Sequence, residues 1–421
     1  TFKNGSIVGA TEGSKPADDT PNWHGAPAIV IQNYCDLTLD NMTVTGGDET
    51  VYTMSNNCGN VVIKDTTINA KNGDVAFDVC RYASYPSVNV TVKGNSTING
   101  TVEVSGVIGE GQSRQLNIEG GSFAGDFRIA DDVPANISIT GGTFNTDVSA
   151  YVADGYTYNS ETKTVEPLSE TNAVAKVGDT YYKTLDEAVA AADNATVTLL
   201  KDVTEKVSIS KNLVLDLNGK TLTGKDLVNS NRKKERIALT ANAGEVKVKN
   251  GIIDGRVNAY NSANLTIDAD VTVKNSYNGS GYDCFGIVVW GDGIFDQEGC
   301  KTPKLTVNGK VIMEKGGVAI STNGNDKSCA IVTINNGAVI STTEDGAIYL
   351  PSGRLTMNGG TVSGPTGIQI CAGSTNITSE FKLHNGTVIA TGADERTSKG
   401  TGDGLIPDGA AISVVNRNYP N

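Results

Sequence analysis

The segment that decides the fold runs from Thr184 to Gly224 and reads TLDEAVAAADNATVTLLKDVTEKVSISKNLVLDLNGKTLTG. Thr184 and Glu187 form a capping-box pattern, because the hydroxyl can accept from a free backbone N–H while the carboxylate reaches back to the cap. The apolar residues that follow share one helical face: Leu185, Ala188, Val189 and Ala192. The sequence therefore predicts one short amphipathic helix over about residues 184–193.

Short strands are predicted directly after this helix. The stretches TVTLL, KVSIS, LVLDL and KTLTG alternate apolar and polar residues, and Asn218-Gly219 supplies a turn. One helix before many short strands is typical of a solenoid with a lid. We expect the helix to cover the open backbone edge of the first coil, which would otherwise pair with another chain.

A weak internal repeat extends this pattern over the chain. The stretches LTLDNMTVTGG (37–47), VNVTVKGNSTING (88–100) and LTVNGKVIMEK (305–315) each read as a strand, a turn and a second strand. Segments of another strand type, such as DVAFDVC and FGIVVWG, lie between them. A period of roughly 20 to 30 residues predicts an all-β fold, the parallel β-helix, in which inward Val, Ile and Leu build a continuous core.

The repeat is interrupted once, so we expect two consecutive units. Residues 1–170 form the first β-helix unit and end in a terminal hairpin (Tyr151–Pro167) with Asn159-Ser160 at its turn. Residues 173–421 form the second unit, which begins with a strand pair and the capping helix. Both chain ends read as open coil edges. Neighbouring copies or flanking repeats of the same protein are therefore the expected partners.

The composition narrows the classes of function. The chain has 421 residues, with 34 Lys+Arg against 47 Asp+Glu and a net charge of −13. This acidic balance argues against binding to nucleic acid or to an anionic membrane surface. No apolar run is long enough to span a bilayer, so no membrane insertion is expected. The seven Cys form no C-x-x-C pair and the chain has two His, so no zinc site is expected.

The opening phrases of the second unit resemble a known superfamily. GDTYYKTLDEAVAAA, TVTLLKDVTE and LVLDLNGKTLTG are similar to the start of right-handed parallel β-helices of the pectate-lyase-like superfamily. The similarity is closer to tandem β-helix repeats of large secreted surface proteins of anaerobic gut bacteria, where a closing phrase like ITGGTFNTDVSAYVADGY recurs. The resemblance implies a right-handed parallel β-helix and an extracellular, cell-surface-associated protein.

The segment from Tyr282 to Cys300 is the leading candidate for a ligand site. It combines carboxylates with aromatic rings, which suits the hydroxyls and the apolar face of a sugar. The residues assigned to it are Tyr282, Asp283, Trp290, Asp292 and Asp296. The alternative is a long loop packed by its own aromatic side chains. Ca²⁺ is the only candidate cofactor, because the oxygen ligands of this segment would suit it.

Two further patches are candidate binding surfaces. The first is a basic run in this acidic chain: Arg232, Lys233, Lys234 and Arg236. It could contact an acidic glycan or the acidic face of a neighbouring chain, and the alternative is a solvated loop. The second surface is an aromatic and basic groove in the first unit, formed by Trp23, His24, Arg81, Tyr82 and Tyr85. The alternative is that these side chains only pack their own loops.

Cys35 and Cys58 occupy similar places in successive coils, each at the start of a strand of the first type. Stacked positions lie about one strand spacing apart, ~4.8 Å, within the Cα range of a disulfide. A Cys35–Cys58 disulfide is therefore one prediction, and a pair of free buried thiols is the other. Cys300 and Cys329 also precede equivalent strands.

The favoured function is a non-enzymatic extracellular surface protein: an elongated β-helical stalk, adhesin or filament element that self-associates end to end and contacts host or microbial glycans. The alternative is a polysaccharide-acting enzyme, a lyase or a glycoside hydrolase, or a glycan-binding module on the same fold. The sequence has no adjacent Asp pair beside a Gly-His-Gly, so no catalytic residue is assigned. Carboxylates and a basic residue converging from three or more coils would favour the enzyme, whereas Thr, Asn and Ser ladders would favour the stalk.

Overall fold

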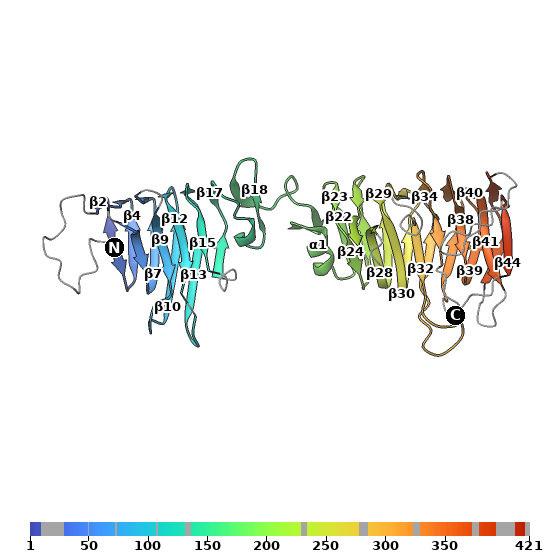
Figure 1. Cartoon of the computed structure of the whole chain (residues 1–421), viewed down its shortest axis with the longest axis horizontal. Helices are drawn as coiled ribbons and strands as arrows, with labels where there is room; N and C mark the ends of the chain where they lie inside the picture. The colour runs from blue at the N-terminus through green and yellow to red at the C-terminus, as the bar shows by residue number, and fades with distance from the viewer. Residues whose placement is uncertain are drawn as a thin grey trace. The chain divides into compact units, whose positions relative to one another are not determined.

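The computed structural model divides the chain into two compact units, Thr1–Leu168 and Ser169–Asn421. Both units are built almost entirely of β-strands (Figure 1). The all-β class predicted from the repeat is confirmed, and the long parallel sheets are consistent with a β-helix-like solenoid. The structure describes residues 1–9, 29–48, 50–71, 74–106, 108–130, 136–228, 234–277, 285–322, 329–372, 379–392 and 409–416.

Three sheets of parallel strands make up the first unit; each of the first five repeats contributes one strand to each sheet, and the sixth contributes to the first two. The first sheet contains β1 (Phe2–Lys3), β4 (Leu37–Asp40), β7 (Gly59–Lys64), β10 (Ser87–Lys93), β13 (Ser113–Ile118) and β16 (Ile137–Ile139). The second contains β2 (Ser6–Val8), β5 (Thr43–Thr45), β8 (Thr67–Asn69), β11 (Thr97–Asn99), β14 (Ser122–Phe123) and β17 (Gly142–Phe144). The third contains β3 (Ile29–Asn33), β6 (Tyr52–Asn56), β9 (Val75–Cys80), β12 (Thr101–Ser105) and β15 (Phe127–Ile129).

The core of this unit consists of apolar side chains stacked in register from one repeat to the next. In the first sheet one such stack is formed by Leu37, Val61, Val90, Leu116 and Ile137. In the second sheet another is formed by Val44, Ile68, Ile98, Phe123 and Phe144. The alternation of apolar and polar residues in each strand places every second side chain in this core. Fixing the register in this way prevents a one-residue slip, which would expose the whole stack.

The unit ends in the predicted hairpin. β18 (Tyr156–Asn159) pairs antiparallel with β19 (Thr164–Pro167), and β19 pairs antiparallel with β17. The Asn159 side chain accepts from the backbone N–H groups of Glu161 and Thr162, which holds the turn. A short 3₁₀ helix, η2 (Ser149–Tyr151), precedes the hairpin.

The second unit contains two sheets, of eight and seventeen strands. The smaller is parallel and contains β23 (Val203–Thr204), β26 (Thr221–Thr223), β29 (Gly251–Asp254), β31 (Val271–Lys274), β34 (Lys310–Met313), β37 (Val339–Thr342), β40 (Thr361–Gly364) and β43 (Thr387–Ala390). The larger contains β20 (Ala175–Val177), β21 (Thr180–Tyr182), β22 (Thr196–Leu199), β24 (Val207–Ile209), β25 (Leu213–Asp216), β27 (Lys225–Val228), β28 (Lys234–Lys249), β30 (Arg256–Ile267), β32 (Ile287–Trp290), β33 (Lys304–Val307), β35 (Ile320–Ser321), β36 (Ile331–Ile334), β38 (Gly346–Leu350), β39 (Gly353–Met357), β41 (Thr366–Ala372), β42 (Ser379–Leu383) and β44 (Ile412–Asn416).

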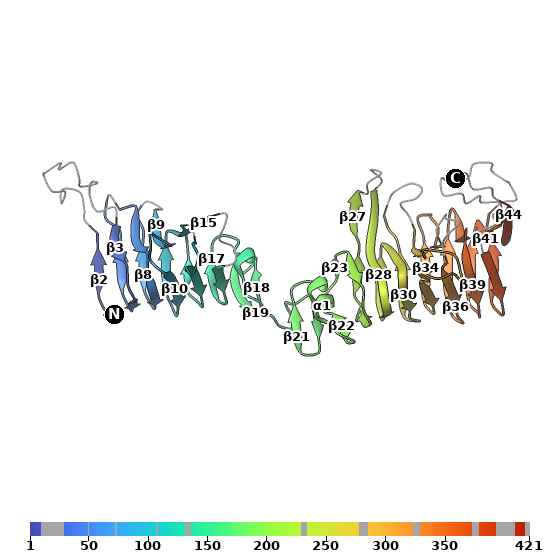
Figure 2. The ribbon, with the colours of Figure 1, turned by 90° about the horizontal axis from the view of Figure 1, so that it is seen from below.

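Two long strands join what would otherwise be two sheets. β28 contacts β24 through its first half and β25 through its second half, and β30 in turn contacts β32 and β33. The register shifts within β28 mark the irregularities at which this strand changes direction. β27 and β28 form an antiparallel hairpin that extends beyond the neighbouring strands (Figure 2).

The predicted helix is confirmed as α1 (Leu185–Ala191), with both hydrogen bonds of the capping box in place. Its apolar face is buried in the core of the second unit. The Glu205 carboxylate accepts from the N–H of Leu185 at 3.1 Å, and Lys211 Nζ donates to the Ala190 carbonyl at 2.7 Å. Opposite charges thus lie at the two ends of the helix dipole.

The helix does not itself pair with the first strand edge, which corrects one expectation. β20 pairs antiparallel with β22, Ala175 opposite Leu199, and so occupies that edge. A helix has its own N–H and C=O groups bonded internally, so it can cover apolar side chains but cannot complete a strand ladder. The hairpin of β20 and β21 closes the edge, and α1 closes the end of the core. No helix in the described part of the chain is long and apolar enough to cross a membrane.

Asn side chains form ladders between successive repeats outside the core. In the second unit, Asn335 Nδ2 donates to Asn308 Oδ1 at 2.8 Å, and Asn358 Nδ2 donates to Asn335 Oδ1 at 3.0 Å. In the first unit, Asn99 Nδ2 donates to Asn69 Oδ1 at 2.7 Å. Each ladder pairs side-chain amides of neighbouring repeats while adding no charge.

Candidate functional site

An aromatic pair lies on two neighbouring parallel strands of the second unit. Tyr260 in β30 stands opposite Trp290 in β32, because the two strands run parallel in this register. The ring centroids are 6.0 Å apart and the planes meet at 83°, an edge-to-face arrangement. Trp290 is 45% exposed although it is a large aromatic side chain, so part of the indole ring is open to solvent.

A hollow of about 310 Å³ adjoins this pair and is lined by Tyr260, Asn261, Trp290, Gly291 and Asp292. We call these five residues the Trp290 platform. Its four side chains offer a phenol, an amide, an indole N–H and a carboxylate. None of these four side chains makes a hydrogen bond or ion pair with another described residue. The platform therefore combines an open ring with polar groups that are free to bind a ligand.

The wall of the platform is a short loop held by backbone contacts. The Asp292 N–H donates to the Lys301 carbonyl at 3.0 Å, and the Lys301 N–H donates back at 2.8 Å. Gly291 packs so closely that a Cβ there would lie 2.9 Å from the Cys329 nitrogen. Only glycine fits at this approach, which fixes the position of the adjacent Asp292 backbone.

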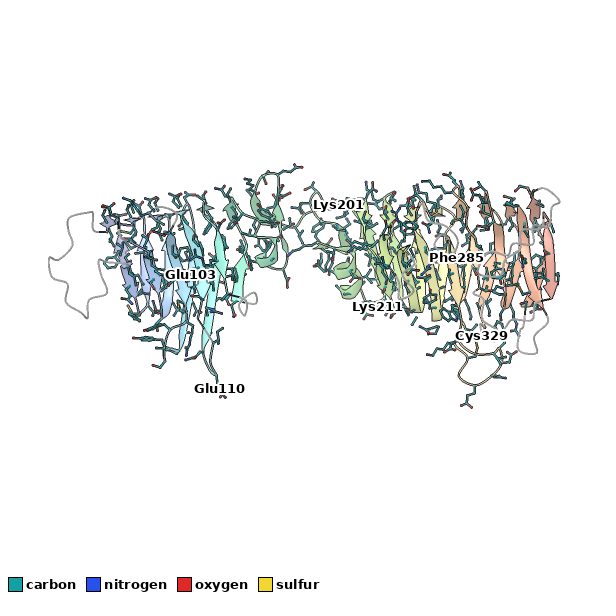
Figure 3. The ribbon with its side chains drawn as sticks, in the orientation of Figure 1. Glu103, Glu110, Lys201, Lys211, Phe285 and Cys329 are labelled. Carbon is teal, nitrogen blue, oxygen red and sulfur yellow. A yellow bond between two sulfur atoms is a disulfide. The ribbon has the colours of Figure 1, made fainter. Side chains whose placement is uncertain are left out.

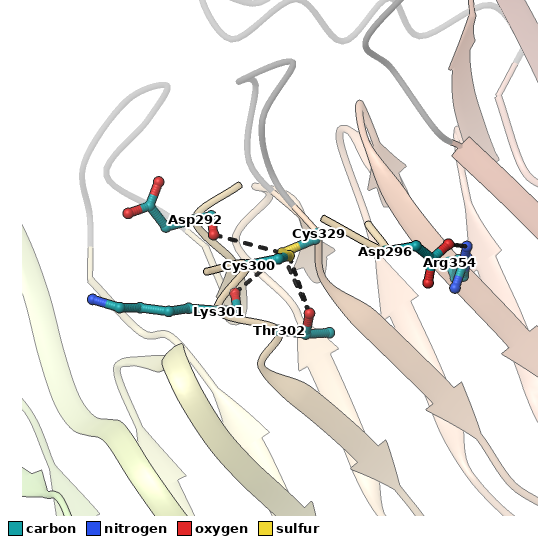
Figure 4. Close-up of a disulfide and its surroundings, with 7 residues drawn as sticks. All are labelled: Asp292, Asp296, Cys300, Lys301, Thr302, Cys329 and Arg354. Atoms are coloured by element: carbon teal, nitrogen blue, oxygen red, sulfur yellow. Dashed lines mark hydrogen bonds and ion pairs between the residues drawn. A yellow bond between two sulfur atoms is a disulfide. The ribbon is translucent and has the colours of Figure 1, made fainter. Parts of the chain in front are cut away.

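A disulfide between Cys300 and Cys329 joins this loop to the next repeat (Figure 4). The Thr302 hydroxyl oxygen lies 3.3 Å from Cys300 Sγ and 3.4 Å from Cys329 Sγ. The Asp292 carboxylate points away from the disulfide in this view. The covalent bond thus holds the loop without using the carboxylate.

Arg354 in β39 holds the tip of the same loop. Its guanidinium lies 4.1 Å from the centroid of the Phe295 ring and 3.2 Å from the Asp296 carboxylate. The Glu380 carboxylate lies 3.6 Å away on its other side. Asp296 is thereby committed to an ion pair, and Arg354 connects the loop to two later strands.

The structure brings together only part of the predicted ligand site. Trp290 and Asp292 lie side by side in the Trp290 platform, whereas Asp296 points to Arg354 (Figure 4). Tyr282 and Asp283 lie outside the described residues. Sequence reasoning missed Tyr260 and Asn261. The available signal was that NAYN and VVWG belong to the same strand type in successive repeats, each with an aromatic ring at its third position.

The basic run forms one strand of the β27–β28 hairpin where it is described. Arg236 Nε donates to the Asp226 carboxylate at 2.6 Å, and its Nη1 donates to Ser276 at 3.1 Å. The hydrogen bond to Asp226 raises the pKa of Arg236. Arg236 thus contributes little free positive charge. The backbone of Lys234 pairs with Val228, and Arg232 and Lys233 lie outside the described residues.

The predicted groove of the first unit is described only in part. Trp23 and His24 lie outside the described residues, so their approach to the other members stays a prediction. Tyr82 and Tyr85 are exposed in the loop between β9 and β10, and both rings lie close to that of Tyr34. Tyr34 follows β3 and was not part of the predicted groove.

Cys35 and Cys58 are free thiols, so the predicted disulfide between them is not present in this structure. The reason is a change of register at the corner between two strands. Asn33 stands opposite Asn56 and Leu37 stands opposite Val61, so the later repeat has one more residue than the earlier one between these two pairings. The extra residue places Gly59, at φ 88°, over the Cys35 carbonyl. Sequence spacing alone does not reveal such a one-residue insertion.

A second polar group, which sequence reasoning missed, crosses the third sheet of the first unit. Its members come from four successive strands and alternate with core residues: Ser55, Asp78, Glu103 and Arg128. We call them the carboxylate row, and Figure 3 labels Glu103 within it. The signal was a single acidic residue inside each of two successive apolar strands, VAFDVC and TVEVS.

The carboxylate row is satisfied by its own neighbours. Asp78 accepts from the Ser55 hydroxyl at 2.9 Å and from the Asn56 N–H at 2.5 Å. Glu103 accepts from the Tyr52 hydroxyl at 3.2 Å and from Arg128 at 3.0 Å. Burial raises the pKa of Asp78 to about 7, and the nearby Glu103 charge adds to this while the two hydrogen bonds oppose it.

No metal site is evident in the described ranges, where no group of three or more His, Cys, Asp or Glu side chains lies close enough to hold an ion. The described residues include an open aromatic platform in the second unit and, in the first, the buried Asp78 beside the half-buried Glu103. Comparison with protein-family models, with curated proteins and with solved structures finds no match for this chain.

Proposed function

We propose that this chain is a right-handed parallel β-helix of an extracellular, cell-surface-associated protein, and that it binds glycans through the Trp290 platform without cleaving them. The observation that carries the proposal is the platform itself. An open indole face stands beside an amide and a carboxylate that have no partner among the described residues. Sugars present an apolar face and several hydroxyls, and this combination complements both.

The platform is also rigid, which favours binding. The loop that forms its wall is held by the Cys300–Cys329 disulfide, by the Asp292–Lys301 backbone pair and by Arg354. A surface that is already ordered loses little side-chain freedom when a ligand binds, so more of the contact energy appears as affinity. A loop packed only for stability would not need an exposed tryptophan at its base.

The rest of the chain supports a stalk or filament element. Each unit has its own continuous core, and short Asn ladders join some of its neighbouring repeats. A solenoid of this kind is stiff because each repeat contacts its neighbours over the whole strand length. Neighbouring copies or flanking repeats that add strands at the coil ends are the proposed partners.

A polysaccharide-acting enzyme is the second candidate, and the carboxylate row is the observation that favours it. Asp78, Glu103 and Arg128 come from three neighbouring repeats, and a carboxyl with a pKa of about 7 is suited to acid catalysis. Asp78 is only 4% exposed, however, and both its oxygens accept hydrogen bonds from the protein. A group so covered is poorly placed to reach a glycosidic oxygen, so binding is preferred over cleavage.

One incubation separates these functions. The chain is applied to immobilised xylan, galactomannan and polygalacturonate, with Ca²⁺ or with a chelator, and both retention and new reducing or unsaturated ends are scored. Retention without new ends is the expected result. New ends that disappear in Glu103→Gln would establish the enzyme instead.

A matched pair of variants assigns any retention to the platform. Trp290→Ala is expected to weaken retention roughly tenfold, because an aromatic contact with burial contributes on the order of 1 kcal/mol or more. Leu383→Ala removes an apolar side chain of similar exposure, 48% against 45%, elsewhere in the same unit. Equal retention by both variants would rule out the Trp290 platform as the binding site.

A further inference from the structure

We propose that three tyrosines of the first unit form a second saccharide-binding surface, separate from the Trp290 platform. The residues are Tyr34, which follows β3, and Tyr82 and Tyr85, which lie in the loop between β9 and β10. We call them the tyrosine cluster. This inference rests on the proposed glycan-binding function and adds a second site to it.

The Tyr34 ring lies close to both of the other rings, which follow a strand two places further along the third sheet. The Tyr34 centroid lies 5.1 Å from that of Tyr85, with the planes 35° apart, and 6.4 Å from that of Tyr82. Tyr34 and the other two are separated by two coils of the chain, so the cluster spans the stacking direction. Coils stack at ~4.8 Å, which is close to the length of one pyranose unit in an extended glycan.

Exposure distinguishes these rings from the other aromatic side chains. Among the described residues only five Phe, Tyr or Trp rings are exposed: Phe2, Tyr34, Tyr82, Tyr85 and Trp290. Three of the five are in the tyrosine cluster, at 36%, 52% and 36% exposure for Tyr34, Tyr82 and Tyr85. Grouped exposed rings mark interaction surfaces more often than single ones do.

The polar groups around the cluster suit a sugar. The Tyr34 hydroxyl accepts from the Gln32 amide, and the Gln112 amide donates to the Tyr85 carbonyl at 3.4 Å. The hydroxyls of Tyr82 and Tyr85 make no hydrogen bond with a described residue. Burial raises the pKa of Tyr34, and the nearby Tyr82, Tyr85 and Asp78 raise it further. Rings with free hydroxyls and neutral amides complement a neutral or weakly charged glycan.

The loop that carries two of the rings has a constrained backbone. The Tyr85 N–H donates to the Tyr82 carbonyl at 3.3 Å, which closes a tight turn. Ala83 within this turn has φ 48°, a left-handed conformation that residues with a Cβ seldom adopt. The turn presents Tyr82 and Tyr85 together, beside Tyr34. A role of the two rings in binding would account for the left-handed conformation of Ala83, because this turn holds both rings beside Tyr34.

The test uses the full chain and two readouts. Affinity electrophoresis in gels cast with xylan, galactomannan or polygalacturonate measures binding by the unaltered protein and by Tyr82→Ala, Trp290→Ala and the double variant. Phe2→Ala is the matched control, because it removes a ring of similar exposure, 50% against 52% for Tyr82, outside both sites. Nitration of tyrosine by tetranitromethane, mapped by mass spectrometry with and without the retained glycan, reports on each ring directly.

Tyr82→Ala is expected to weaken binding roughly three- to tenfold, and the double variant to lose more than either single variant. Tyr82 and Tyr85 should be protected from nitration by the glycan, whereas Phe2→Ala should bind normally. Unchanged binding by Tyr82→Ala together with unprotected Tyr82 would overturn the second site. If Trp290→Ala still loses binding in that case, the proposed function stands. If the unaltered protein binds none of the glycans and no ring is protected, both fail.

Discussion

The carboxylate row of the first unit and the Trp290 platform of the second use similar residue types in opposite ways. In the row, Asp78 and Glu103 are covered, and each carboxylate accepts from neighbouring side chains or backbone. In the platform, Asp292 and Trp290 are open, and neither side chain makes a polar contact with a described residue. Buried carboxylates that are satisfied internally favour structure, whereas exposed polar groups beside an open ring favour recognition.

The comparison depends on each unit having its own core. Leu116 in the first unit and Leu265 in the second are both fully enclosed between strands of neighbouring repeats. Leu116→Ala and Leu265→Ala should each lower the unfolding free energy of the affected unit by about 2–5 kcal/mol, because each leaves a cavity. Hydrogen exchange followed by mass spectrometry should find faster exchange only in the unit that carries the change. Faster exchange throughout the chain would mean that the two units unfold as one.

The next largest expected effect is a pH dependence of stability that arises from Asp78 in the carboxylate row. Because the pKa of Asp78 is about 7 in the folded chain and near 3.8 when unfolded, the folded state keeps a proton that the unfolded state has released. Stability of the first unit should therefore fall as pH rises from about 4 to about 7, by up to about 4 kcal/mol. Asp78→Asn keeps an acceptor for the Asn56 N–H but cannot ionise, so this fall should disappear.

The control for that prediction is the exposed Asp126, whose change to Asn should leave the pH dependence in place. Urea unfolding at pH 5 and at pH 8, followed by exchange in peptides of the first unit, measures both variants. A pH dependence that survives in Asp78→Asn would show that another group is responsible, and the carboxylate row would lose its structural interpretation.

The disulfide tests whether the platform must be held in place. Replacing Cys300 and Cys329 together by Ser removes a covalent link across 29 residues, which in the chain-entropy model costs about 3.5 kcal/mol. We expect glycan retention to fall while exchange in the first unit stays the same. Reduction of the unaltered protein should lower glycan retention in the same way. Alkylation followed by mass spectrometry confirms that the disulfide has been reduced. Full retention after reduction would show that the backbone pair and Arg354 suffice.

The sequence predicted the fold where local chemistry determines it. The Thr184–Glu187 capping box, the hairpin after Tyr156 and the strand repeat all follow from residues close together in the chain. Register does not follow in this way. The insertion at Gly59 moves Cys58 out of line with Cys35, and its place becomes clear only from the strand pairings on either side. The helix α1 was also expected to cover the first strand edge, but β20 occupies that edge, because only a strand can pair with it.

The candidate site was predictable only in part for the same reason. Trp290 and Asp292 are neighbours in sequence and could be grouped by eye, but Tyr260 meets Trp290 only through the pairing of β30 with β32. Likewise Asp78 and Glu103 meet through the pairing of β9 with β12. Contacts between repeats depend on the length of each intervening turn. That length is set by the packing of the whole coil rather than by any short motif.

The most direct test of the account uses tryptophan fluorescence. The chain has two tryptophans, Trp23 and Trp290, so Trp23→Phe leaves Trp290 as the single reporter. Titration of this variant with oligosaccharides from a retained glycan should change the Trp290 emission saturably, at the concentrations that support retention. The change should be absent with oligosaccharides of glycans that are not retained. Retention without any change in Trp290 emission would contradict the claim that the platform binds the sugar.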